Sequence, residues 1–377
     1  LDFISTTGLR QNLGIGDEYT DPTDLIHEMV RRLDAIHDQP NLLILDNVDE
    51  SIEPLRSRLP TPPNWHLILT SREEINGFTP MPLDFLQPDD AFLLFKKHYT
   101  LSGLTDAHIR ELARAVDYHT LTLEILAKTA QVQRYPFDQL KAALTQDARA
   151  NVQITRPGSD KIERMTSFLA GIFSLSRLSD NELWLLQQFA CLPSEFHPYQ
   201  LLHDLIRPEA GGRGEVFAET LHELNRKGWL LGNANADAYK MHLVVAEVVK
   251  KEQAPALEAI SSLLDNVAAQ LSIDYSKDNP IHKFPWIPFG KALLEVAEKQ
   301  TAATVEEANK VALLQNELAL VLKALGDYQG AKTLLEKAMR SAEQNFGPDH
   351  PTTAVSYSNL ALVLKALGDY QGAKTLL

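Results

Sequence analysis

Apolar residues near the start of the chain follow two different patterns. Between Leu25 and Ile36 they recur at helical spacing, directly after Asp21-Pro22, a pair suited to the N-cap and first position of a helix. The runs "LLILD" (42–46) and "WHLILT" (65–70) are short and continuous, which is typical of strands buried on both faces of a parallel sheet. One helix and two such strands predict an α/β domain.

From about residue 86 the pattern becomes purely helical. Helices are expected at 88–98, 105–116 and 121–132, and the polar segment "RPGSDK" (156–161) is expected to be a linker. Three further segments, "LSDNELWLLQQFACLP", "VFAETLHELNRKGWLL" and "AYKMHLVVAEVVKKE", follow at 178–252. Their helix, helix and short strand-like "GWLLG" are typical of a winged helix.

The C-terminal region repeats itself. The eighteen residues at 318–335 recur without change at 360–377, a period of 42 residues, which indicates a helical solenoid. Each unit has a Gly-Asp turn between two helices, and Gly326 and Gly368 suit the left-handed geometry of that turn. Leu322, Leu325, Tyr328 and Ala331 are expected to pack between the helices; the array as given is too short to line a binding groove.

Composition narrows the class of protein. The 377 residues are 44% hydrophobic and 23% charged, which is ordinary for globular domains, and no apolar run has the roughly 20 residues that a membrane span needs. The single cysteine, Cys191, excludes a disulfide framework and favours a cytoplasmic setting. A net charge of −14 argues against a broad nucleic-acid surface. Because the chain starts at Leu1 and stops within a repeat, we expect it to be an excerpt of a longer protein.

The order of these segments resembles the signal-transducing STAND ATPases, in particular their NB-ARC class. Five short motifs carry the resemblance: "LLILDNVDE", "ILTSRE", "FLQPDDAFLLFKKH", "YHTLTLEILAK" and "YKMHLVVAEVV". The resemblance implies a multidomain α/β plus α protein: a partial P-loop NTPase parallel sheet (1–84), a helical subdomain (85–155) and a winged-helix subdomain (156–255). A helical linker (256–308) and truncated tetratricopeptide (TPR) repeats (309–377) would follow.

The resemblance assigns roles to residues at the ends of the two strands. Asp46 matches the Walker B carboxylate that holds Mg²⁺, and Arg72 matches the sensor arginine that contacts the terminal phosphate of ATP. Asn47 stands where the family usually has a second acid, although Asp49 could replace that acid. We therefore expect a slow ATPase at most.

Two later motifs imply contacts to ADP. Thr120 and Leu121 lie in the segment that resembles the family's Gly-Leu-Pro-Leu-Ala stretch beside the adenine, with Thr120 where proline is usual. His242 matches the histidine of the MHD motif, which contacts the β-phosphate of ADP in the closed state. No G-x-x-x-x-G-K-[ST] phosphate loop is present, because Gly290-Lys291 is followed by alanine in a helical segment. We expect that loop upstream of Leu1.

The repeats are similar to the 42-residue TPR units of the kinesin light chain type, whose concave surface binds peptides or proteins. The whole resemblance implies an ADP-off, ATP-on switch that senses a protein ligand on its repeats and oligomerises, in defence or cell-death signalling. Two alternatives stay open. One is a degenerate scaffold that binds no nucleotide, and the other is a winged-helix transcription regulator, disfavoured because Arg213, Arg226 and Lys227 face as many glutamates.

Overall fold

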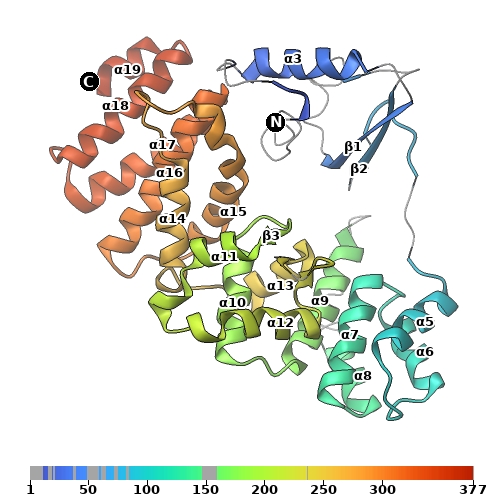
Figure 1. The fold of residues 1–377 in the computed structure, drawn as a ribbon. Helices are drawn as coiled ribbons and strands as arrows, with labels where there is room; N and C mark the ends of the chain where they lie inside the picture. Colours follow the sequence, from blue (N-terminus) through green and yellow to red (C-terminus); the bar gives the residue numbers. More distant parts are fainter. Residues whose placement is uncertain are drawn as a thin grey trace. The chain divides into compact units, whose positions relative to one another are not determined.

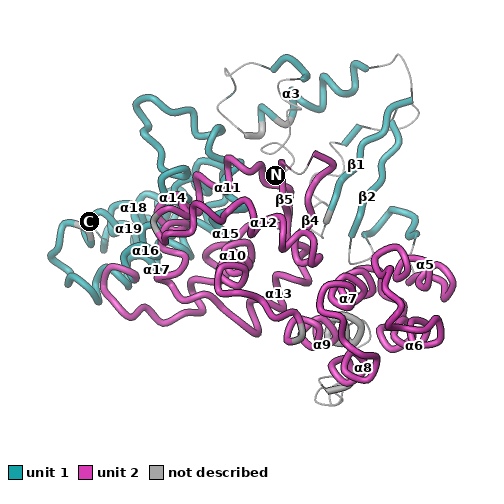
Figure 2. The backbone as a smooth tube through the Cα atoms, turned by 60° about the horizontal axis from the view of Figure 1, so that its bottom comes forward, with its two compact units in different colours: residues 1–83, 267–291, 308–377 teal, residues 84–266, 292–307 magenta. Residues whose placement is uncertain are grey.

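The computed structural model describes residues 12–15, 19, 22–36, 40–48, 59–60, 65–71, 75–81, 85–146, 159–235 and 237–376. The chain packs as two compact units, each assembled from separate stretches of sequence. One contains residues 1–83, 267–291 and 308–377, and the other contains residues 84–266 and 292–307 (Figure 2).

Within residues 1–83, the part that the structure describes includes one long helix and a pair of strands (Figure 1). Helix α3 (Pro22–Asp34) precedes strands β1 (Asn41–Val48) and β2 (Trp65–Ser71), which pair in parallel as the sequence predicts. The helix and one face of the sheet share an apolar core of Leu33, Leu43, Leu45, Trp65 and Ile75. The indole N–H of Trp65 donates to the carbonyl of Leu33 and ties the sheet to the helix end.

The opposite face of this sheet corrects one expectation. Leu42, Ile44 and Ile68 are 53%, 58% and 52% exposed, so β1 and β2 are covered on one face and not on both. The sequence cannot distinguish these cases, because a run of apolar residues does not say which neighbours pack against it.

The second unit begins with four helices. These are α5 (Pro88–His98), α6 (Asp106–Ala115), α7 (Thr120–Gln133) and α8 (Phe137–Gln146). The first three match the predicted helices, and α5 begins at a proline in its first turn. Helix α8 is an element that the sequence analysis does not predict, although its buried residues Leu140, Ala143 and Leu144 share one helical face.

The next segment also lies in the second unit and combines helices with short strands. Its elements are α9 (Ser159–Leu175), α10 (Asp180–Ala190), β3 (His197–Pro198), α11 (Tyr199–Ile206), α12 (Phe217–Lys227), β4 (Leu231–Gly232), β5 (Ala238–Lys240) and α13 (Leu243–Glu252). The strands form an antiparallel sheet in the order β3-β5-β4. The expected linker at 156–161 is partly wrong, because α9 already begins at Ser159; residues 156–158 lie outside the described part.

The remaining chain is helical. Helices α14 (Ser261–Leu271) and α15 (Ile287–Ala297) precede the repeats, which consist of α16 (Val305–Leu325), α17 (Tyr328–Phe346), α18 (Pro351–Ala366) and α19 (Tyr370–Leu376). In each repeat a glycine, Gly326 or Gly368, has a positive φ of 91° or 84°, as the sequence predicts. The helices pack through buried residues such as Leu322 and Ala331, whereas Tyr328 is 37% exposed and is not a core partner.

The fold is therefore a mixed α/β and helical architecture with a helical solenoid at its C-terminal end. None of the helices in the described part combines the length and the apolar character that crossing a membrane requires.

Candidate functional site

Asp46 projects from the carboxyl end of β1, where parallel sheets hold their ligands. The strands pair in register up to Leu45 opposite Leu69, and the register then shifts before Val48 reaches Ser71. Asp46 is exposed, and its Oδ1 accepts a hydrogen bond from the hydroxyl of Thr70 at the end of β2. Among the described residues, the strand end thus presents the carboxylate of Asp46, oriented by Thr70.

Three other positions of the expected site cannot be compared with the structure. Arg72 and Asp49 lie outside the described residues, and so does the side chain of Asn47. The roles of Arg72 as sensor and of Asp49 as a second acid stay predictions.

The segment at 118–128 enters helix α7, and its cap is a residue that the sequence analysis does not single out. His119 is the N-cap, and its Nδ1 accepts from the backbone N–H of Thr122 at 3.3 Å. Thr120 is exposed at the first helical position and Leu121 is half-buried, whereas Leu123 is fully buried in the core. An adenine contact by Thr120 or Leu121 therefore stays a prediction, and Leu123 is a packing residue.

His242 occupies the same kind of position at the start of α13. Its Nδ1 accepts from the backbone N–H of Val244 at 3.3 Å, which confirms that this histidine begins a helix. A ring nitrogen that accepts a hydrogen bond carries no proton, so the Nε2 of each capping histidine carries it and remains a donor.

Burial favours the neutral form of both imidazoles. It lowers the pKa of His119 from 6.5 to about 4, and the nearby His242 lowers this pKa further. Burial also lowers the pKa of His242, with a smaller contribution from Lys240. The two rings are therefore close enough for their charges to interact.

The sequence analysis misses two of these residues, Thr70 and His119. A hydroxyl at the end of the strand after Asp46 is a usable signal for Thr70, because adjacent parallel strands end at the same edge. For His119 the signal is a polar residue that directly precedes a helical run and lies three positions before Thr122.

The residues at the strand end fit one hard cation in an incomplete site. Among the described residues there is no group of three or more histidines, cysteines or acids that could hold a metal by itself. One carboxylate suffices for Mg²⁺ when waters and phosphate oxygens supply the other ligands. Gly290-Lys291 lies inside α15, as expected, so this pair is not a phosphate loop.

Each of the three basic side chains considered near α12 already interacts with another side chain. The guanidinium of Arg226 pairs with Glu223 at 2.5 Å, and the ammonium of Lys227 pairs with Glu182 at 2.6 Å. Arg213 lies over the ring of Trp184, with its guanidinium carbon 4.7 Å from the ring centroid. These three cations therefore do not form an open phosphate-binding surface.

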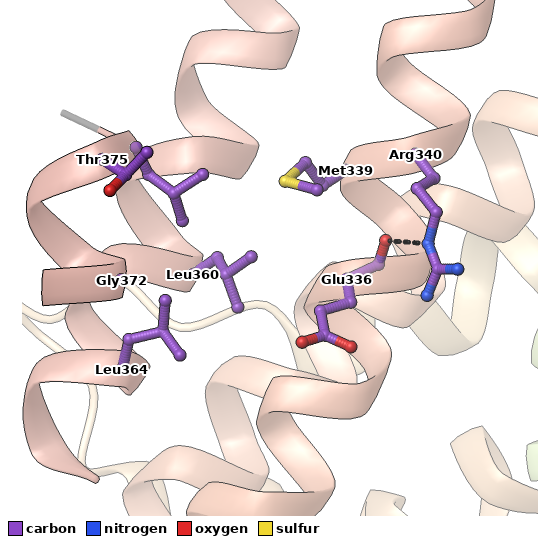
Figure 3. Close-up of a pocket in the computed structure, with 8 residues that line it drawn as sticks. Glu336, Met339, Arg340, Leu360, Leu364, Gly372 and Thr375 are labelled. Carbon is purple, nitrogen blue, oxygen red and sulfur yellow. Dashed lines mark hydrogen bonds between the residues drawn. The ribbon is translucent and has the colours of Figure 1, made fainter. Parts of the chain in front are cut away.

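The repeats carry a surface groove of about 580 Å³ between α17, α18 and α19. Figure 3 shows Met339, Leu360 and Leu364 lining it, with Glu336 and Arg340 at its α17 side. Arg340 is held there, because its Nε donates to the carbonyl of Glu336 in the preceding turn at 3.1 Å. This hollow lies between neighbouring helices of the repeats, and the expectation that so few repeats line no ligand-binding groove stays a prediction.

Comparisons with known proteins agree with part of this description. Residues 310–377 match the family model of the tetratricopeptide repeat, so the C-terminal segment is a TPR region. No curated protein matches the chain.

Among solved structures, the chain is similar to a Signal Transduction ATPase with Numerous Domains (STAND) protein with a tetratricopeptide repeat sensor from Pyrococcus horikoshii. The identity is 15% and the TM-score is 0.46; the match covers 100% of this chain and 54% of the other. The chain thus spans about half the length of that protein.

Proposed function

We propose that this chain is part of a nucleotide-gated switch, closed with ADP and open with ATP, whose TPR region senses a protein or peptide. The observation that carries the proposal is the position of Asp46, an exposed carboxylate at the carboxyl end of one of two adjacent parallel strands. This is the place at which α/β sheets bind nucleotides and their metal ions.

Residues at the strand ends would supply part of the nucleotide site. Asp46 would hold Mg²⁺ directly or through a water, and Arg72 would contact the terminal phosphate with a planar, permanently charged group. The amides that cradle the phosphates would come from a P-loop outside this sequence, since none is present in it. Bound Mg²⁺ would neutralise charge on the phosphates during slow hydrolysis.

Residues of the second unit would distinguish the two nucleotide states. His242 keeps its Nε2 proton as a donor while its Nδ1 caps α13, which suits contact with the β-phosphate of ADP. A hydrogen bond to a charged group contributes roughly 1.5–3 kcal/mol, which shifts a closed–open equilibrium about ten- to hundredfold. A contact made only in the closed state would therefore hold the protein inactive until exchange for ATP permits self-association.

The TPR region would supply the input. TPR arrays stack repeats into an extended binding surface, and residues 310–377 belong to this family. Ligand binding there would favour the open state, and by linkage the open state would bind the ligand more tightly. Defence or cell-death signalling is the setting that the resemblance of the five motifs suggests.

A protein-binding scaffold without nucleotide is the second candidate. The TPR match favours it, because that match is independent of any nucleotide motif. A DNA-binding regulator has less support, since Arg226 and Lys227 of α12 are already paired with carboxylates.

Nucleotide content separates the switch from the scaffold. The full-length protein, purified without added nucleotide and denatured, is expected to release ADP close to one equivalent on an ion-exchange column. The chain of residues 1–377 alone is expected to bind adenine nucleotide weakly or not at all. Folded full-length protein that releases no nucleotide would favour the scaffold.

A further inference from the structure

The neighbour of Asp46 across the sheet is fixed by the register of the strands. Ile44 lies opposite Ile68 and Leu45 lies opposite Leu69, so Asp46 and Thr70 are the next residues on their strands. Side chains alternate between faces, and Asp46 therefore emerges on the exposed face of Ile44, as Thr70 emerges on that of Ile68.

The two side chains are joined at that point. The hydroxyl of Thr70 donates to Oδ1 of Asp46, whereas Oδ2 accepts no hydrogen bond from the residues that the structure describes. The register shift that follows Leu45 places two residues of β1 against one of β2, so the strand end bends where the carboxylate projects. Bulges of this kind re-aim side chains next to functional sites.

The hydroxyl is the part of the Thr70 side chain that contacts Asp46. Thr70 is exposed, and its neighbour on the same face is the apolar Ile68. A valine has the same shape and an equal preference for strands, so it would serve the sheet as well. The hydroxyl of threonine or serine gives the carboxylate a donor that valine lacks, and the β-branched side chain of threonine also holds a stiff χ1 angle.

We propose that Thr70 is a positioning residue for Asp46, which holds the carboxylate in the orientation that binds a divalent cation through Oδ2. This inference rests on the proposed nucleotide site. Hydrogen-bond partners of metal ligands fix ligand orientation, and their loss typically weakens metal binding by roughly 10- to 100-fold. Thr70 therefore sets the Mg²⁺ dependence of nucleotide binding and does not itself contact the nucleotide.

The test compares Thr70→Val, Thr70→Ser and Asp46→Ala in the full-length protein. A fluorescent ATP analogue is titrated with chelator present and again over a range of MgCl₂ concentrations. Thr70→Val is expected to raise the half-saturating Mg²⁺ concentration roughly tenfold, with Mg²⁺-free affinity unchanged. Thr70→Ser, which restores the donor, is expected to stay close to wild type. A melting curve for each variant checks that all are folded.

Three results would overturn the inference. A wild-type Mg²⁺ response in Thr70→Val, while Asp46→Ala has lost it, would show that Asp46 orients itself and would leave the proposed function intact. A wild-type response in Asp46→Ala would remove this strand end from the metal site, and the proposed function would fail together with the role of Thr70. Equal loss in Thr70→Ser and Thr70→Val would assign the effect to side-chain shape and also contradict a donor role.

Discussion

His119 and His242 each fill a position that helices usually give to Ser, Thr, Asp or Asn. Both imidazoles cap a helix through Nδ1 and retain a proton on Nε2. A histidine in this position can therefore have a structural role, a ligand-binding role or both, and substitutions have to separate the two.

At His242, substitution by asparagine separates the structural role from the ligand-binding role, because asparagine is a strong N-cap residue but has no imidazole. His242→Ala is expected to cost about 1 kcal/mol of stability through the lost cap, whereas His242→Asn keeps that stability. If His242 also clamps ADP, both variants are expected to oligomerise without ligand. Light scattering after gel filtration and thermal unfolding report the two effects. A purely structural histidine would give monomers in both cases, with only the alanine variant less stable.

The pH dependence of stability tests His119. Its pKa is about 4 in the folded protein, below the ordinary 6.5, so between these values the unfolded chain binds more protons than the folded one. The contribution of His119 to stability is therefore complete above pH 6.5 and is lost as the pH falls towards 4. His119→Asn keeps the cap and should flatten urea unfolding midpoints across this window. The lowered pKa of His242 leaves a smaller slope in the variant. An unchanged slope would show that His119 does not titrate as described.

At the scale of elements, one carboxylate joins two helices. Glu182 accepts from the backbone N–H of Ser179 at 2.8 Å and so closes the capping box of α10, and its other oxygen pairs with Lys227 of α12 at 2.6 Å. The side chains of Lys227 and Glu182 are only 12% and 8% exposed. Removing one charge would leave the other buried without a partner.

Glu182→Gln is accordingly expected to lower stability by about 1–3 kcal/mol. The double variant Glu182→Gln with Lys227→Met should recover part of that loss, since no charge is left buried. Glu223→Gln is the matched control, because it breaks the exposed pair with Arg226 and should cost less than about 1 kcal/mol. Urea midpoints of the four proteins check this order. Equal losses in Glu182→Gln and Glu223→Gln would contradict a buried ion pair.

At Gly171, substitution by alanine is expected to change the stability in the direction opposite to that given by helix propensity. Alanine in place of glycine inside a helix normally stabilises by about 0.5–1 kcal/mol. At Gly171 of α9 the added Cβ would lie 2.2 Å from the backbone carbonyl oxygen of Ala143 in α8, so Gly171→Ala is expected to destabilise. Gly290→Ala in α15 is the control, because its Cβ would meet only leucine side-chain tips at 3.0–3.3 Å. A melting temperature for Gly171→Ala at or above wild type would rule out this close helix contact.

These elements also show what a sequence can predict. Helices α5 and α7 were predicted from their apolar residues, whereas α8 was missed although Leu140, Ala143 and Leu144 also recur at helical spacing; the packing of α8 on α9 became visible only in the structure. The parallel pairing of β1 with β2 was predictable from their apolar runs, but the exposure of Leu42, Ile44 and Ile68 was not. Exposure depends on neighbours that the run itself does not encode.

At the scale of the molecule, the structure of the C-terminal end can be predicted from its sequence more fully than the candidate site near the N-terminal end. Identical segments 42 residues apart predict the C-terminal solenoid directly, because each repeat packs on the next. The candidate site is less determined. Asp46 and His242 were found from motifs, but Thr70 and His119 became visible only through the strand register and a helix cap. Partners in a site are set by pairing across elements, and local sequence carries little of that information.

The working cycle of the whole switch depends on how fast ATP is hydrolysed, and Asp46 with Asn47 should set that rate. Asp46→Ala is expected to abolish Mg²⁺-dependent ATP binding and to keep the full-length protein monomeric, because the only acid in the described part of β1 is lost. An amide cannot accept a proton from water, so hydrolysis by the wild type should be slow. Asn47→Asp should restore a paired acid, speed single-turnover hydrolysis and shorten the life of the oligomer. The assay combines single-turnover kinetics with light scattering on the same samples. Unchanged hydrolysis in Asp46→Ala would place the catalytic metal elsewhere, because a strand end that binds Mg²⁺ cannot lose its carboxylate without losing the rate.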